Sequence, residues 1–135
     1  VNYMINLDMI GRYESSKGLA VSGTGTAPVW EPLLKSLSSE KLIIKTDSSG
    51  VGPSDHTSFY LKNIPVLHFF TGSHSDYHKP TDDWDKINYA GEAEILRIIV
   101  KVIESPETQN KLAFLTTKNK SMTPRSSFKV KTFTY

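Results

Sequence analysis

Three apolar runs of strand length are each followed by a polar segment that carries aspartate or histidine. The runs cover residues 2–7, 41–45 and 64–70. Asp8 comes directly after the first run, and Asp55-His56 follow the second across a loop rich in glycine and serine. The loop 73–85 follows the third run and holds two histidines and four aspartates. Ligands of parallel α/β sheets bind beyond the carboxyl ends of the strands, so we expect the three segments to meet at one edge.

Helical patterns alternate with these runs. Amphipathic spacing predicts helices over residues 28–37 and 88–103, and a short helix over 57–61. A shorter strand is predicted at 19–21. Strands that alternate with helices predict a layered α/β fold, with a central, largely parallel mixed sheet flanked by helices. The run 2–7 is apolar on both alternations, so we expect a central strand covered on both faces.

The charge of the chain is uneven along its length. Residues 106–135 carry six lysines or arginines against one acid, Glu107, whereas residues 1–105 are net acidic. The basic residues lack clustered arginines and stacking motifs, so we interpret the tail as a solubilising segment and not as a nucleic-acid arm. We therefore divide the chain into a domain over 1–105 and a basic tail over 106–135. Residues 128–135 alternate in a way that is typical of an edge strand or of the start of an appended domain.

Several classes of protein are disfavoured by what the sequence lacks. It has no cysteine, which excludes disulfides, thiolate metal sites and thiol nucleophiles. The longest apolar run, 95–103, is interrupted by Arg97 and Lys101 and falls short of the ~20 residues of a membrane span. The absence of a Gly-x-Ser-x-Gly elbow argues against a serine hydrolase.

The polar segments carry the chemistry of a metal site. Carboxylate and imidazole are the usual oxygen and nitrogen ligands of zinc and similar divalent ions. A carboxylate in an apolar frame, such as Asp8, is costly to bury unless it is paired or bound to a cation. Purely structural roles for these residues stay open as alternatives to a metal site. Asp8 would cap a turn, Asp55 would cap the short helix, and His68 would be a hydrogen-bonded core histidine. The residues alone predict a metal-dependent α/β enzyme.

Three motifs follow one another along the chain. They are Asn6-Leu7-Asp8-Met9-Ile10-Gly11-Arg12, Ser54-Asp55-His56-Thr57-Ser58-Phe59 with Asn63-Ile64-Pro65, and Ser75-Asp76-Tyr77-His78-Lys79-Pro80-Thr81-Asp82-Asp83. Together, and in this order, they resemble the M28 family of zinc aminopeptidases, and the resemblance covers residues 2 to about 104. Asn63 replaces the glycine that is usual in the family. The resemblance implies a zinc-exopeptidase-like fold and hydrolysis of N-terminal residues from peptide substrates.

The resemblance also implies roles for single residues. The family carries two zinc ions, and by resemblance Asp8 ligates one and His78 the other. Tyr77 would hydrogen-bond the oxyanion of the tetrahedral intermediate. The remaining candidates are implied as substrate-side or metal-supporting residues. They are Asp55, His56, Asp82 and Asp83.

Two family motifs belong upstream of Asn6-Leu7-Asp8 and are not found there. The first is the His-x-Asp segment that would supply a zinc histidine and the bridging aspartate, and the second is the Glu-Glu pair with the general base, a dipeptide that occurs nowhere in the sequence. We therefore expect the chain to resemble the C-terminal half of a catalytic domain, to bind zinc weakly and to be inactive alone. We also expect exposed apolar surface, and hence self-association or pairing with the missing N-terminal half. By resemblance the protein is exported, to the periplasm or the extracellular space of a bacterium.

Two alternatives stay open. A non-catalytic relative would keep the fold as a binding or structural module and lose the metals. The presence of Asp8, Tyr77 and His78 argues against it, because a decayed site has no reason to keep all three. A glutaminyl cyclase would share the fold and use one zinc for intramolecular acyl transfer.

Overall fold

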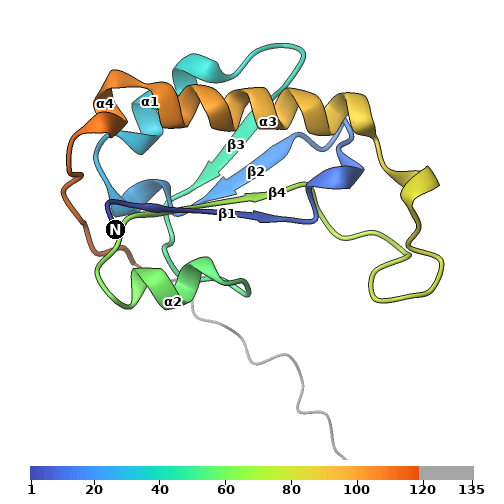
Figure 1. The fold of residues 1–135 in the computed structure, drawn as a ribbon, viewed down its shortest axis with the longest axis horizontal. Helices are drawn as coiled ribbons and strands as arrows, with labels where there is room; N and C mark the ends of the chain where they lie inside the picture. Colours follow the sequence, from blue (N-terminus) through green and yellow to red (C-terminus); the bar gives the residue numbers. More distant parts are fainter. Residues whose placement is uncertain (119–135) are drawn as a thin grey trace, which may run out of the picture.

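The computed structural model describes residues 1–118 and shows helices packed on one sheet (Figure 1). The strands are β1 (Met4–Asp8), β2 (Leu19–Ser22), β3 (Ile44–Asp47) and β4 (Val66–Phe70). The α-helices are α1 (Trp30–Leu37), α2 (His56–Tyr60), α3 (Tyr89–Glu104) and α4 (Pro106–Gln109). Short 3-10 helices are η1 (Ile10–Arg12), η2 (Thr24–Thr26) and η3 (Trp84–Lys86). The strand considered for residues 128–135 lies outside the described residues.

The four strands form a mixed sheet in the order β1-β4-β2-β3. β1 pairs with β4 and β2 with β3 in parallel, while β2 and β4 are antiparallel. The predicted α/β fold with a largely parallel mixed sheet is therefore confirmed. The central place predicted for residues 2–7 is wrong within the described residues. β1 forms one edge of the sheet, and its Leu7 is 41% exposed.

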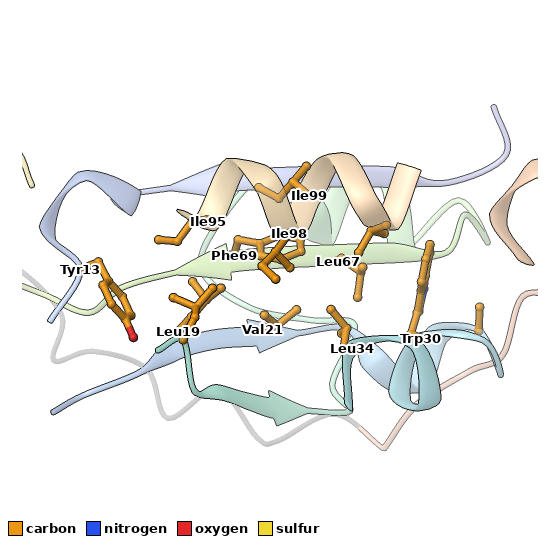
Figure 2. Close-up of a cluster of buried hydrophobic side chains, with 13 residues drawn as sticks. Tyr13, Leu19, Val21, Trp30, Leu34, Leu67, Phe69, Ile95, Ile98 and Ile99 are labelled. Carbon is orange, nitrogen blue, oxygen red and sulfur yellow. The ribbon is translucent and has the colours of Figure 1, made fainter. Parts of the chain in front are cut away.

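Helices cover both faces of the sheet. α3 and α1 lie on one face and α2 lies on the other (Figure 1). Successive side chains of a strand point to opposite faces, so each strand serves two layers. Leu67 and Phe69 of β4 face α3, and His68 stacks on a residue of α2 on the opposite face. The main core lies between the sheet, α3 and α1 (Figure 2). Its labelled members are Tyr13, Leu19, Val21, Trp30, Leu34, Leu67, Phe69, Ile95, Ile98 and Ile99.

α3 follows the predicted helix closely because both of its ends are encoded locally. Asn88 is the N-cap, and its side chain accepts a hydrogen bond from the Gly91 N–H at 3.0 Å. The same side chain donates to the Tyr13 carbonyl at 2.9 Å, which ties the helix start to the segment after η1. Pro106 then opens α4, since proline fits the first helical position and cannot continue a preceding helix. No helix of the described part is long and apolar enough to cross a bilayer.

Residues 110–118 run back along the domain. The Asn2 side chain accepts from the Leu112 N–H at 2.7 Å, and Leu115 donates its N–H to the Thr26 carbonyl at 2.9 Å. The first part of the basic tail therefore lies against η2 and the segment that precedes β1. The boundary predicted before this tail stays a prediction.

Candidate functional site

A cavity of about 270 Å³ lies at the carboxyl ends of β1 and β4. Asp8 and Phe70 pair in register at these ends, and Ala20 of the antiparallel strand β2 is paired with the same Phe70. Residues of β1, β4 and β2 therefore meet at the same end of the sheet. The lining residues are Asp8, Met9, Ala20, Ser22, Pro53, His68, Phe70, Ser73 and Tyr77. A larger hollow beside α1, of about 610 Å³, is lined by Pro28, Val29, Pro32, Leu33, Ser36 and Glu107. It carries a single carboxylate and no histidine, so we place the candidate site at the smaller cavity.

Asp8 is half-buried and is held by Ser54, which Asn6 holds in turn. The Ser54 hydroxyl donates to Asp8 Oδ2 at 2.9 Å. Asn6 Nδ2 in turn donates to Ser54 Oγ at 2.6 Å. Asn6 and Asp8 are two residues apart on β1 and therefore point to the same face. The loop before α2 thus fixes the orientation of a carboxylate on β1, as hydrogen-bonded neighbours do for metal-ligating carboxylates.

Two buried histidines lie on the α2 face of the sheet beside this cavity. His56 and His68 stack with ring centroids 4.4 Å apart and an interplanar angle of 8°. His68 Nδ1 lies 3.2 Å from Ser22 Oγ, so His68 is the buried, hydrogen-bonded histidine that the sequence predicted. Burial lowers the pKa of His68, against the opposing effect of the Asp8 carboxylate. His68 is therefore neutral at pH 7.

Asp55 and His56 were predicted together but have different surroundings. Asp55 is exposed at the start of α2, and its side chain makes no capping hydrogen bond to that helix. Asp55 therefore occupies the N-cap position that was considered for it, without a side-chain capping bond. His56 is fully buried against His68. Neither residue is among those lining the cavity. Their substrate-side or metal-supporting roles stay predictions.

The loop 73–86 is organised around Asp76. Its Oδ1 accepts from Lys86 Nζ at 2.8 Å and from the Thr81 hydroxyl at 2.7 Å. Its Oδ2 accepts from Arg12 Nη1 at 3.2 Å. These donors, the Lys86 ammonium first, hold the pKa of Asp76 well below its usual range. Asp76 is thus a carboxylate that holds the structure of the loop.

Asp82 and Asp83, which were predicted as substrate-side or metal-supporting residues, also fix this loop. Asp82 Oδ1 accepts from Arg12 Nη2 at 2.6 Å, and its Oδ2 lies 3.9 Å from His74 Nε2. Asp83 caps η3 by accepting from the Trp84 N–H at 2.8 Å. From the sequence, Arg12 was identified only as the last residue of a motif. Its contacts with two distant aspartates could not be found by local pattern.

Tyr77 and His78 sit together on the outer part of the loop. Their rings stack with centroids 3.8 Å apart, and His78 takes a left-handed backbone with φ of 56°. Tyr77 is 46% exposed and lines the cavity with Asp8. His78 is exposed and is not among the lining residues. The structure therefore brings Asp8 and Tyr77 to one cavity, whereas His78 lies outside its lining and is stacked on Tyr77.

A complete metal site is not formed by the described residues. Within residues 1–118, no three His, Cys, Asp or Glu side chains converge closely enough to hold a metal ion. Zinc in proteins has at least three protein ligands in catalytic sites. A zinc ion with a full set of ligands therefore does not fit residues 1–118 alone. The assignment of Asp8 and His78 as ligands stays a prediction.

Comparisons with known proteins give one family. The sequence model described as Peptidase family M28 matches residues 1–103. The match contains Asp8, the cavity and the loop that carries Tyr77 and His78. No curated protein and no solved structure matches the chain. The matched residues are most of the chain and include both parallel strand ends at the candidate site. The chain therefore belongs to peptidase family M28.

Proposed function

We propose that the chain supplies part of the active site of a metal-dependent aminopeptidase, which removes N-terminal residues from peptides at a dizinc centre. Membership of a peptidase family supports a hydrolase. The observation that carries the proposal is that Asp8 and Tyr77 face the same cavity at the ends of β1 and β4. In the proposal, Asp8 and His78 are metal ligands and Tyr77 is the catalytic residue of this chain.

The walls of the cavity suit one amino-acid side chain of a peptide. Met9, Ala20 and Phe70 make part of the lining apolar, and Asp8 and Tyr77 add the polar groups. Small-molecule sites commonly combine apolar walls with a few convergent polar groups. We place the first side chain of the substrate in this cavity and its carbonyl beside the phenol of Tyr77. The phenol O–H then donates to the oxygen on which negative charge develops.

The remaining part of the site would come from polypeptide outside the described residues. The missing His-x-Asp and Glu-Glu segments would be supplied by the proposed N-terminal half of the domain. The outer edge of β1 supports this, because no strand among residues 1–118 pairs with it and its Leu7 is 41% exposed. A strand laid along this edge would bring its own residues close to Asp8.

The outer face of α3 supports a second contact surface. Leu96, Val100 and Ile103 are each exposed by more than 40% and recur at helical spacing. As a purified 135-residue chain, the protein should therefore self-associate, and light scattering should report a mass above 15.1 kDa that rises with concentration. Leu96→Glu with Val100→Lys should restore the monomer. A wild-type chain that stays monomeric at all concentrations contradicts this expectation.

Tyr77→Phe tests the catalytic role. The test uses the chain joined to the segments that complete the site, with zinc and an aminoacyl p-nitroanilide as substrate. The variant should lower kcat about 100-fold and leave KM nearly unchanged, because the lost donor acts on charge that develops in the transition state. Tyr89→Phe is the matched control, since the Tyr89 hydroxyl donates to the Trp84 carbonyl outside the cavity.

The outcomes of this test separate the parts of the proposal. Full kcat in Tyr77→Phe removes Tyr77 from catalysis. Chelator-sensitive hydrolysis by the 135-residue chain alone shows that the chain needs no further segment. Absence of zinc-dependent hydrolysis in the completed protein overturns the aminopeptidase itself.

A further inference from the structure

Arg12 joins two segments of the site that are far apart in the sequence. It is the last residue of η1, four residues after Asp8. Its Nη1 donates to Asp76 Oδ2 at 3.2 Å and its Nη2 donates to Asp82 Oδ1 at 2.6 Å. The side chains of Arg12 and Asp76 are only 18% and 15% exposed. The guanidinium therefore bridges two carboxylates on either side of Tyr77 and His78, of which Asp76 is largely buried and Asp82 is 42% exposed.

The ends of the loop are fixed by other contacts. Near its start, the Thr71 hydroxyl donates to the Met9 carbonyl. At its end, the Asn88 N–H donates to the Gly11 carbonyl at 2.8 Å. The middle of the loop, which carries Tyr77 and His78, meets the segment after β1 through Arg12. Fixing the ends alone would leave this middle part free to shift over the cavity.

Lys86 also binds Asp76, but this contact has a different structural role. It belongs to η3 at the far end of the same loop, so its bond to Asp76 closes the loop on itself. Only a contact from another element sets where the closed loop lies relative to β1. Arg12 comes from such an element, and its planar fork reaches two carboxylates at once. A lysine at this position would present a single point charge and could not span both.

We propose that Arg12 is a positioning residue, which holds the loop carrying Tyr77 and His78 in place relative to Asp8. The proposal rests on the proposed function in so far as these three residues act together. Its structural part, the placement of the loop by Arg12, does not depend on peptide hydrolysis. The two parts can therefore be tested separately.

Hydrogen exchange of the metal-free 135-residue chain tests the placement. Within the loop, the N–H groups of Tyr77, Lys79, Asp82 and Asp83 donate to loop carbonyls. In Arg12→Met these four amides should exchange at least about tenfold faster, while the amides of the central strands β2 and β4 keep their protection. Arg12→Lys should not rescue the loop, because it restores the charge and not the fork. Arg97→Met is the matched control, since it removes a guanidinium paired with Glu94 on α3.

A second measurement tests whether the position of the loop affects catalysis. In the completed, zinc-loaded protein, Arg12→Met should lower kcat about tenfold or more with KM nearly unchanged, as expected for supporting residues around a metal site. Unchanged loop exchange in Arg12→Met overturns the placement, and full rescue by Arg12→Lys overturns the role of the fork. Faster exchange with an unchanged kcat overturns the positioning of the catalytic groups. If the wild-type completed protein is inactive, the proposed function fails, while the exchange result still decides the placement.

Discussion

Trp30→Ala should lower the free energy of unfolding by about 3–5 kcal/mol, as large-to-small changes of buried aromatic residues do. Trp30 is the first residue of α1 and is fully buried. Its ring meets Tyr3 edge-to-face, with centroids 5.3 Å apart and planes at 84°. It therefore joins the helix layer to the segment that enters β1. Alanine would leave a cavity that the surrounding strands and helices fill only in part.

Urea unfolding followed by far-UV circular dichroism measures this loss without relying on the deleted fluorophore. Trp30→Phe should cost less than about 2 kcal/mol, since it keeps an aromatic ring in contact and removes the indole N–H. That N–H is buried and has no acceptor among residues 1–118. Trp84→Ala is the control, because Trp84 is 70% exposed. Equal losses in Trp30→Ala and Trp84→Ala would show that Trp30 is not a central core residue.

Local pattern was enough to predict most of the elements of this fold. Helix α3 could be predicted because its N-cap Asn88, its apolar face and the following Pro106 are all encoded locally. The apolar run of β1 was also recognised, yet its place in the sheet was wrong. An apolar strand sequence indicates that both faces of the strand are covered. It does not indicate how many strands lie beside it in the sheet. Sheet order depends on contacts between distant residues, which no single run contains.

The start of β3 shows a second limit of pattern. The apolar run 41–45 predicted a strand from Lys41, whereas β3 begins at Ile44. Leu42 is buried in the core, and its N–H and carbonyl are both bonded to Ser39 in a turn. A buried residue in a turn and a buried residue in a strand give the same apolar signal. Tertiary packing decides between them.

The candidate site was predictable where it depends on strand ends. Asp8 and Tyr77 were both expected at the carboxyl edge of the sheet, and both line the cavity there. Ser54 was recognised only within a motif, because its bond to Asp8 crosses from a loop to a strand. His68 was predicted as a core residue but not as part of the cavity wall. Its alternation with Phe70 on β4 is the signal that would have placed both on the wall.

His56 should make the stability of the protein depend on pH below neutrality. Its ring is fully buried, and its Nδ1 lies 3.5 Å from Asn6 Nδ2. An amide nitrogen only donates, so Nδ1 of the neutral imidazole accepts from it and the proton sits on Nε2. Protonation would place an N–H against this donor and a positive charge in the core. Burial first, and then neighbouring His68, lower the pKa of His56 from 6.5 to about 4, against the opposite effects of Asp55 and Asp8.

The sign of the pH effect follows from which state binds the proton. Between pH 6.5 and 4 the unfolded chain protonates His56 and the folded chain does not. The free energy of unfolding therefore falls as pH drops through this window, by about 2–3 kcal/mol for this one residue. Urea unfolding at pH 7 and at pH 4.5 measures it. His56→Gln should be less stable at pH 7 and lose the part of the pH dependence that His56 contributes, while the part from buried His68, whose pKa is also lowered by burial, remains. His78→Gln, which removes an exposed histidine, should keep the whole pH dependence. The same loss between pH 7 and 4.5 in His56→Gln as in the wild type would assign the pH dependence to other groups.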